Sequence, residues 1–178
     1  MDTLPPAPLT PELPPLGLPE NQLAIRRAAA QLCLMLGWVV LHEMPLPNGR
    51  RADIMALRPD GGFVCIEVKS GPRDFLTDSK WPEYRDCSDA LLFAVDDRFP
   101  LDLLPEDVGV MVACVGPHCR PGGVVEAASL EREAAAHKLP PATRRAMMQR
   151  FATLAAGRLA MLEDPAITQS LRAALRVE

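Results

Sequence analysis

Two acidic residues and one lysine, Asp53, Glu67 and Lys69, have types and a spacing suited to hydrolysing a phosphodiester. Two carboxylates held close together repel each other, and a hard divalent cation relieves that repulsion while it also binds water and phosphate oxygens. The bound cation acidifies a water molecule and neutralises charge on the phosphate, and a neighbouring lysine can orient the attacking water. The three residues therefore predict a metal-dependent nuclease site, provided that the chain brings them together.

The strands expected around these residues do bring them together. Apolar and β-branched residues predict strands at 51–57 and 63–70, and the Pro-Asp-Gly-Gly sequence between them predicts a tight turn. Two strands joined by so short a turn form an antiparallel hairpin. The centre of the turn places Asp53 opposite Glu67 or the residue after it, and the alternation of side chains puts Glu67 and Lys69 on one face.

An ordinary alternative is that Glu67 and Lys69 lie on the solvent face of an amphipathic strand, with Asp53 in a salt bridge. The pattern Glu-x-Lys is common on strands, so taken alone it would favour that alternative. The set of three residues at hairpin spacing, followed at once by Ser70-Gly71-Pro72, favours the nuclease site instead.

The rest of the sequence predicts a mixed central β-sheet flanked by helices, an α/β fold. Helical spacing or strand-like apolar runs predict the following order: a helix at 21–36, a strand at 38–44, the hairpin, one or two short helices at 74–84, strands at 90–95 and 108–115, an edge strand at 122–127, and helices at 141–162 and 167–175. The first nineteen residues contain seven prolines. Residues 1–18 are therefore expected to form a disordered tail, and residues 19–178 a single domain.

Composition narrows the class of protein. Of the 178 residues, 48% are apolar and 24% are charged, and the net charge of −4 argues against a wholly basic nucleic-acid coat but allows a local basic groove. The five cysteines form no regular framework, which is typical of a reducing compartment. The three histidines are scattered and none is paired with a nucleophile, so an acyl-transfer enzyme is disfavoured.

The N-terminus and the apolar runs predict where the protein works. The first residues lack the basic start and unbroken apolar stretch of a secretory signal. The longest apolar stretch, 28–41, is interrupted and too short to span a membrane. We expect a cytoplasmic protein without a membrane partner.

These motifs resemble those of known proteins. Arg51-Ala52-Asp53-Ile54 and Ile66-Glu67-Val68-Lys69 are similar to the signature of the PD-(D/E)XK nuclease superfamily, and the order of helix and strands is similar to that superfamily's core. A closer resemblance, from about residue 26 to residue 159, is to the MmcB-like DNA repair proteins of bacteria. It is carried by Gly49-Arg50-Arg51-Ala52-Asp53, Ile66-Glu67-Val68-Lys69-Ser70, Asp74-Phe75, Asp78-Ser79-Lys80-Trp81-Pro82-Glu83-Tyr84, Phe93-Ala94-Val95, Phe99-Pro100 and Leu104-Pro105.

The resemblance implies a restriction-endonuclease-like (PD-(D/E)XK) core and a magnesium- or manganese-dependent deoxyribonuclease that acts in DNA repair. Its partners would be DNA and other DNA repair proteins. Asp53 and Glu67 would bind Mg²⁺ or Mn²⁺ together with the Val68 carbonyl, and Lys69 would position water. Ala52 stands where the superfamily signature has proline, a position that shapes the backbone rather than the chemistry.

Three further acidic residues are candidates for supporting positions, each with an ordinary alternative. Glu20 heads the first helix, where the resemblance implies an additional metal ligand, but it also suits the helix dipole. Glu43 on the first strand would be an outer ligand or a partner of Arg50 or Arg51. Asp74 could cap the helix that follows the hairpin.

Five residues are candidate nucleic-acid contacts. Lys80 could reach a DNA phosphate, and Tyr84 could stack on a base, as could Trp81, or both rings could pack in the core. Arg144 and Arg145 open the most basic segment of the chain, which would contact the DNA backbone or form a solvated helix face.

Two other functions remain open on the sequence. One is a non-catalytic DNA-binding or scaffold protein of a repair complex that retains the nuclease fold, although the intact trio of acids and lysine argues against it. The other is a structural protein whose proline-rich N-terminus recruits a partner, which only the composition of the tail supports.

Overall fold

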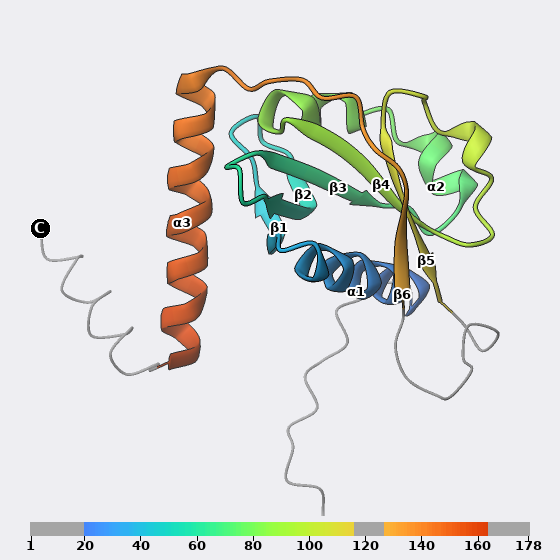
Figure 1. Cartoon of the computed structure of the whole chain (residues 1–178), viewed down its shortest axis with the longest axis horizontal. Coiled ribbons are helices and arrows are strands. Elements are labelled where there is room, and N and C mark those ends of the chain that lie inside the picture. Colours follow the sequence, from blue (N-terminus) through green and yellow to red (C-terminus); the bar gives the residue numbers. More distant parts are fainter. Residues whose placement is uncertain (1–19, 116–126, 164–178) are drawn as a thin grey trace, which may run out of the picture.

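The computed structural model describes residues 20–115 and 127–163, and these form one mixed β-sheet with helices on both faces (Figure 1). The order of the six strands in the sheet is their order in the sequence. The strands are β1 (Val39–Pro45), β2 (Arg51–Leu57), β3 (Phe63–Val68), β4 (Ala90–Asp96), β5 (Gly109–Cys114) and β6 (Ala127–Arg132). The central strands β3, β4 and β5 run parallel, whereas β1–β2, β2–β3 and β5–β6 are antiparallel pairs. The α/β fold with a mixed sheet is therefore confirmed.

Two hydrophobic cores lie on opposite faces of this sheet. On one face, helix α1 (Glu20–Met35) buries Ile25 and Cys33 together with Ile54 and Ile66 of the hairpin. The other face is covered by α2 (Pro72–Thr77), the short 3-10 helix η1 (Trp81–Cys87) and the first half of α3 (Pro141–Glu163), with Phe99 and Leu104 on either side of a second 3-10 helix, η2 (Leu101–Leu103). Because β3 and β4 are covered on both sides, nearly every residue in them is buried, as in the central strands of α/β proteins.

The helical stretch that follows the hairpin is two helices rather than one. Pro72 opens α2 and Pro82 lies in the first turn of η1, positions where the missing N–H of proline costs little. Between them, Asp78 has an extended backbone, which ends α2. The break matters for the site, because it turns Asp78 back toward the hairpin.

An edge strand is present beside β5. Strand β6 covers Ala127–Arg132 and pairs with β5, whereas residues 122–126 of the strand predicted at 122–127 lie outside the described residues. The predicted disordered tail at 1–18 and the predicted last helix at 167–175 lie outside the described residues. Within residues 20–115 and 127–163, no helix has the length and apolar character needed to cross a membrane.

Candidate functional site

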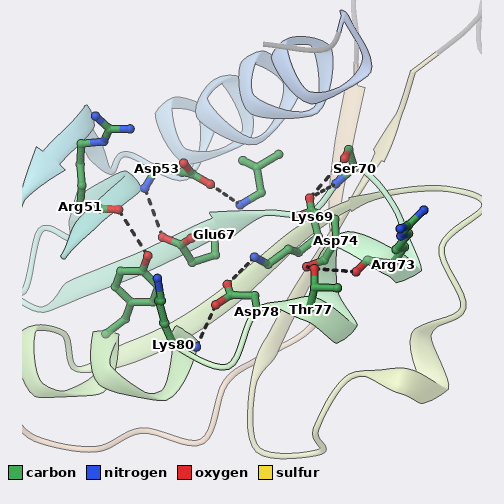
Figure 2. A network of polar contacts seen from close by, with 12 residues as sticks. Arg51, Asp53, Glu67, Lys69, Ser70, Arg73, Asp74, Thr77, Asp78 and Lys80 are labelled. Carbon is green, nitrogen blue, oxygen red and sulfur yellow. Dashed lines mark hydrogen bonds and ion pairs between the residues drawn. The ribbon is translucent and has the colours of Figure 1, made fainter. Parts of the chain in front are cut away.

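The predicted juxtaposition of Asp53 and Glu67 is present at the end of the β2–β3 hairpin. Ile54 pairs with Ile66, so Asp53 lies beside Glu67 as the sequence spacing predicts. Beyond the Ile54–Ile66 pair, backbone N–H groups of the two strands donate to the carboxylates of Asp53 and Glu67 (Figure 2). The Asp53 N–H donates to Glu67 Oε1 at 3.2 Å, and the Val68 N–H donates to Asp53 Oδ2 at 2.9 Å. Each carboxylate is thus fixed by the strand that carries the other.

Burial and mutual repulsion strongly perturb this pair. Glu67 is only 4% exposed. Its burial, and next the nearby negative charge of Asp53, raise its pKa to about 8. Burial also raises the pKa of Asp53, although the Val68 N–H and the Arg26 guanidinium oppose that rise. Without a cation, the site therefore retains a proton near neutral pH that two exposed carboxylates would release.

Lys69 lies on the same side of the hairpin end and is held by a third carboxylate. Its ammonium donates to Asp78 Oδ2 at 2.5 Å, and the lysine is only 5% exposed. Asp78 also accepts the Lys80 N–H at 2.8 Å. Burial alone would raise the pKa of Asp78, but these two hydrogen bonds outweigh it and lower the pKa. Asp78 therefore stays charged and fixes the position of Lys69, a role that its place in the motif did not reveal.

Arg26 of α1 is a second residue that the sequence reasoning missed. Its guanidinium donates to Glu43 Oε1 and, at 2.8 Å, to Asp53 Oδ1, while Arg26 is 6% exposed. The signal available in the sequence was its place between Ile25 and Ala29 on the buried side of the first helix, where a charged residue needs a partner.

The supporting acids have varied outcomes. Glu43 binds Arg26 and Arg51, so the predicted partnership with Arg51 is present, and its backbone has a φ of 52°. Asp74 does not cap α2 as predicted. It lies in the first turn and accepts the Ser70 N–H at 3.1 Å, which fastens the chain directly after Lys69. Glu20 opens α1, but its side chain is outside the described structure.

Two predicted DNA contacts are corrected by the structure. Tyr84 is 8% exposed and its hydroxyl donates to the Arg51 carbonyl at 3.4 Å, so its ring packs in the core rather than stacking on a base. Arg144 donates to the Asp89 carboxylate at 2.5 and 2.8 Å and to the Gly61 carbonyl at 2.9 Å, so it joins elements within the protein. Of the other three predicted contacts, Lys80 and Arg145 have exposed side chains, whereas Trp81 is partly buried against the core.

The protein is thus an α/β protein with a mixed sheet. A buried pair of acids and a lysine held by a third carboxylate lie at the end of its β2–β3 hairpin. The family described as DNA repair protein MmcB-like matches residues 10–166, and the chain therefore belongs to the MmcB-like DNA repair family. The chain also resembles a solved structure, the SPO1766 protein of unknown function from Silicibacter pomeroyi. The two are 36% identical with a TM-score of 0.72, over 85% of this chain and 96% of that chain. No curated protein matches.

Proposed function

We propose that this MmcB-like protein is a metal-dependent DNA nuclease that hydrolyses phosphodiesters during DNA repair. The observation that carries the proposal is the buried pair Asp53 and Glu67, locked together at the hairpin end with Lys69 beside them. Membership of the DNA repair family supports DNA as the substrate.

The residues at the hairpin end fit Mg²⁺ or Mn²⁺. Both carboxylates are hard oxygen ligands. The pKa of Glu67 is raised by burial and next by the charge of Asp53, and a bound cation would offset both by stabilising the ionised carboxylate. In the described part of the chain, no group of three or more His, Cys, Asp or Glu side chains is arranged to hold a metal ion. The ligands would therefore be Asp53, Glu67, the Val68 carbonyl, water and a substrate phosphate, which is the mixed set that Mg²⁺ prefers. When bound, the ion supplies an acidified water and neutralises charge on the phosphate.

The chain's own residues would perform the other tasks. Lys69, anchored by Asp78, would orient the attacking water and add positive charge beside the phosphate. Lys80 and Arg145 are exposed and would bind the DNA backbone, which explains how a chain of net charge −4 could still hold a polyanion.

A second candidate function is a non-catalytic DNA-binding or scaffold protein that retains the nuclease fold. The observation that favours it is that two of the predicted catalytic side chains are already bound within the protein. One oxygen of Asp53 accepts a hydrogen bond from Arg26, and the Lys69 ammonium donates to Asp78.

Cleavage assays separate the two functions. The purified protein is incubated with nicked, flapped, branched and single-stranded DNA, with Mg²⁺, with Mn²⁺ or with a chelator. We expect cleavage of at least one substrate with a metal ion and none with the chelator. DNA binding without cleavage of any substrate would favour the scaffold and contradict the nuclease.

The anchoring of Lys69 gives a separate prediction. Asp78→Asn removes the charge that holds the ammonium but keeps the shape, so we expect DNA cleavage to slow by about tenfold or more with little change in DNA affinity. The measurement is single-turnover cleavage together with DNA binding. The matched control is Asp86→Asn, a change to another acid of the same segment. Equal rates for parent and Asp78→Asn would show that Lys69 needs no anchor.

A further inference from the structure

We infer that Arg26 competes with the divalent cation for Asp53, so that the metal-free site is held together by a guanidinium that metal must displace. The inference rests on the proposed nuclease function and concerns what regulates metal binding at that site.

Both oxygens of the Asp53 carboxylate accept hydrogen bonds within the protein. Its Oδ2 accepts the Val68 N–H at 2.9 Å, and its Oδ1 accepts an Arg26 N–H at 2.8 Å. Both oxygens are therefore engaged before any metal ion arrives. The Val68 bond comes from backbone that the sheet holds in place, whereas the Arg26 bond comes from a side chain on a different element, α1. The Arg26 contact is the one that can yield.

The positive charge of Arg26 would repel a divalent cation bound to Asp53. Arg26 is nearly buried, and a divalent cation on Asp53 would lie close to its guanidinium. Like charges repel strongly at short range where water is excluded, so both cations cannot occupy the same carboxylate at full strength. In the absence of metal, the same guanidinium offsets the repulsion between Asp53 and its acidic neighbours, Glu43 and Glu67.

Arg26 also has a place to go. Its other N–H group donates to Glu43, and the Glu43 side chain is 33% exposed, so the guanidinium remains paired when it leaves Asp53. Its present position is not an ideal fit, because the buried Arg26 Nε has no hydrogen-bond partner among the residues that the structure describes. Arg26 is thus a positioning residue: its guanidinium holds the Asp53 carboxylate in place and lowers the affinity of the site for metal.

The test measures Mn²⁺ binding by calorimetry on the full chain. We expect Arg26→Gln to bind Mn²⁺ about tenfold more tightly than the parent, because it frees one oxygen of Asp53 and removes a repelling charge. Arg51→Gln is the matched control. It removes an arginine that also pairs with Glu43, at 2.5 Å, but that is 69% exposed and has no hydrogen bond to Asp53, so its affinity should stay within about twofold.

Arg26→Lys guards against loss of folding in the glutamine variant. Lysine keeps the positive charge but loses the planar fork that joins two carboxylates, so its Mn²⁺ affinity should lie between those of the parent and Arg26→Gln. Thermal melting gives a second measurement: Mn²⁺ should raise the melting temperature of either Arg26 variant more than that of the parent.

The outcomes distinguish this inference from the proposed function. If Asp53→Asn abolishes Mn²⁺ binding but both Arg26 variants bind no more tightly than the parent, the competition is overturned and the metal site stands. If neither the parent nor any arginine variant binds Mn²⁺, the metal-dependent nuclease itself is overturned. Tighter binding by the Arg26 variants, with Arg51→Gln unchanged, supports the competition.

Discussion

Glu67→Gln should abolish metal-dependent DNA cleavage and, in the same molecule, make the metal-free protein more stable above neutral pH. Glutamine keeps the shape of the side chain, and its amide oxygen can still accept the Asp53 N–H. It removes the negative charge that would help to bind the metal ion. We expect cleavage to fall on the order of 10³-fold, the size of effect that follows the loss of one group stabilising transition-state charge.

The gain in stability follows from the pKa of Glu67, which burial raises from its ordinary value of 4.5 to about 8. The folded protein holds this proton over a range in which the unfolded chain has lost it. The stability that the protonated carboxyl contributes is complete below about pH 4.5 and is lost as the pH rises through about 8. A glutamine cannot ionise, so it escapes that loss, which amounts to a few kcal/mol.

Urea unfolding from about pH 5 to pH 9, in the presence of a chelator, measures this difference. The two free energies of unfolding should diverge as the pH rises, with Glu67→Gln the more stable. Glu133→Gln, a change at an exposed glutamate, should follow the parent. If the free energies of unfolding of the parent and of Glu67→Gln changed in parallel with pH, the raised pKa of Glu67 would be contradicted. Added Mn²⁺ should reduce the difference, because the cation stabilises the ionised form.

The parts of the fold predicted from sequence are those that local patterns determine. The β2–β3 hairpin was predicted with its register because a Pro-Asp-Gly-Gly turn and two short strands determine which residues face each other. Strands β4 and β5 were predicted because they are continuous apolar runs. Strand β6 was not predicted beyond residue 127 because its sequence, Ala-Ala-Ser-Leu-Glu-Arg, has little strand character of its own, and its pairing with β5 determines its structure.

Only the residues of the site that belong to the β2–β3 hairpin, or follow it directly, were predicted from the sequence. Asp53, Glu67 and Lys69 were found because fewer than twenty residues and one turn relate them. Arg26 lies on α1 and reaches Asp53 across the fold, a contact between residues 27 positions apart that no local pattern encodes. Asp78 belonged to a recognised motif, but its role depends on the break between α2 and η1 that directs its carboxylate toward Lys69. Counterions of buried charges are therefore the part of this site that requires the three-dimensional structure.

Asp89→Ala should destabilise the protein by roughly 3–5 kcal/mol, because it leaves several buried donors without an acceptor. The Asp89 carboxylate accepts the Phe63 N–H at 2.8 Å, the Leu139 N–H at 3.0 Å and two N–H groups of Arg144. Burial would raise the pKa of Asp89, but the bonds from Arg144 and the two backbone amides lower it, so the group is charged at neutral pH. One side chain thus joins the start of β3 to the segment before α3 and to α3 itself.

The same network engages Arg144, so that the adjacent and exposed Arg145 is left as the proposed DNA contact. Arg144→Ala should destabilise the fold, since it leaves Asp89 buried without its counterion and frees the Gly61 carbonyl of the hairpin turn. Arg145→Ala should change the free energy of unfolding by less than about 0.5 kcal/mol, because that side chain is exposed. If Arg145 contacts phosphate, its loss should weaken DNA binding across sequences and lower the salt dependence of binding by about one counterion. Chemical denaturation and salt-titrated DNA binding measure both effects, and a large loss of stability for Arg145→Ala, or none for Arg144→Ala, would contradict the assignment.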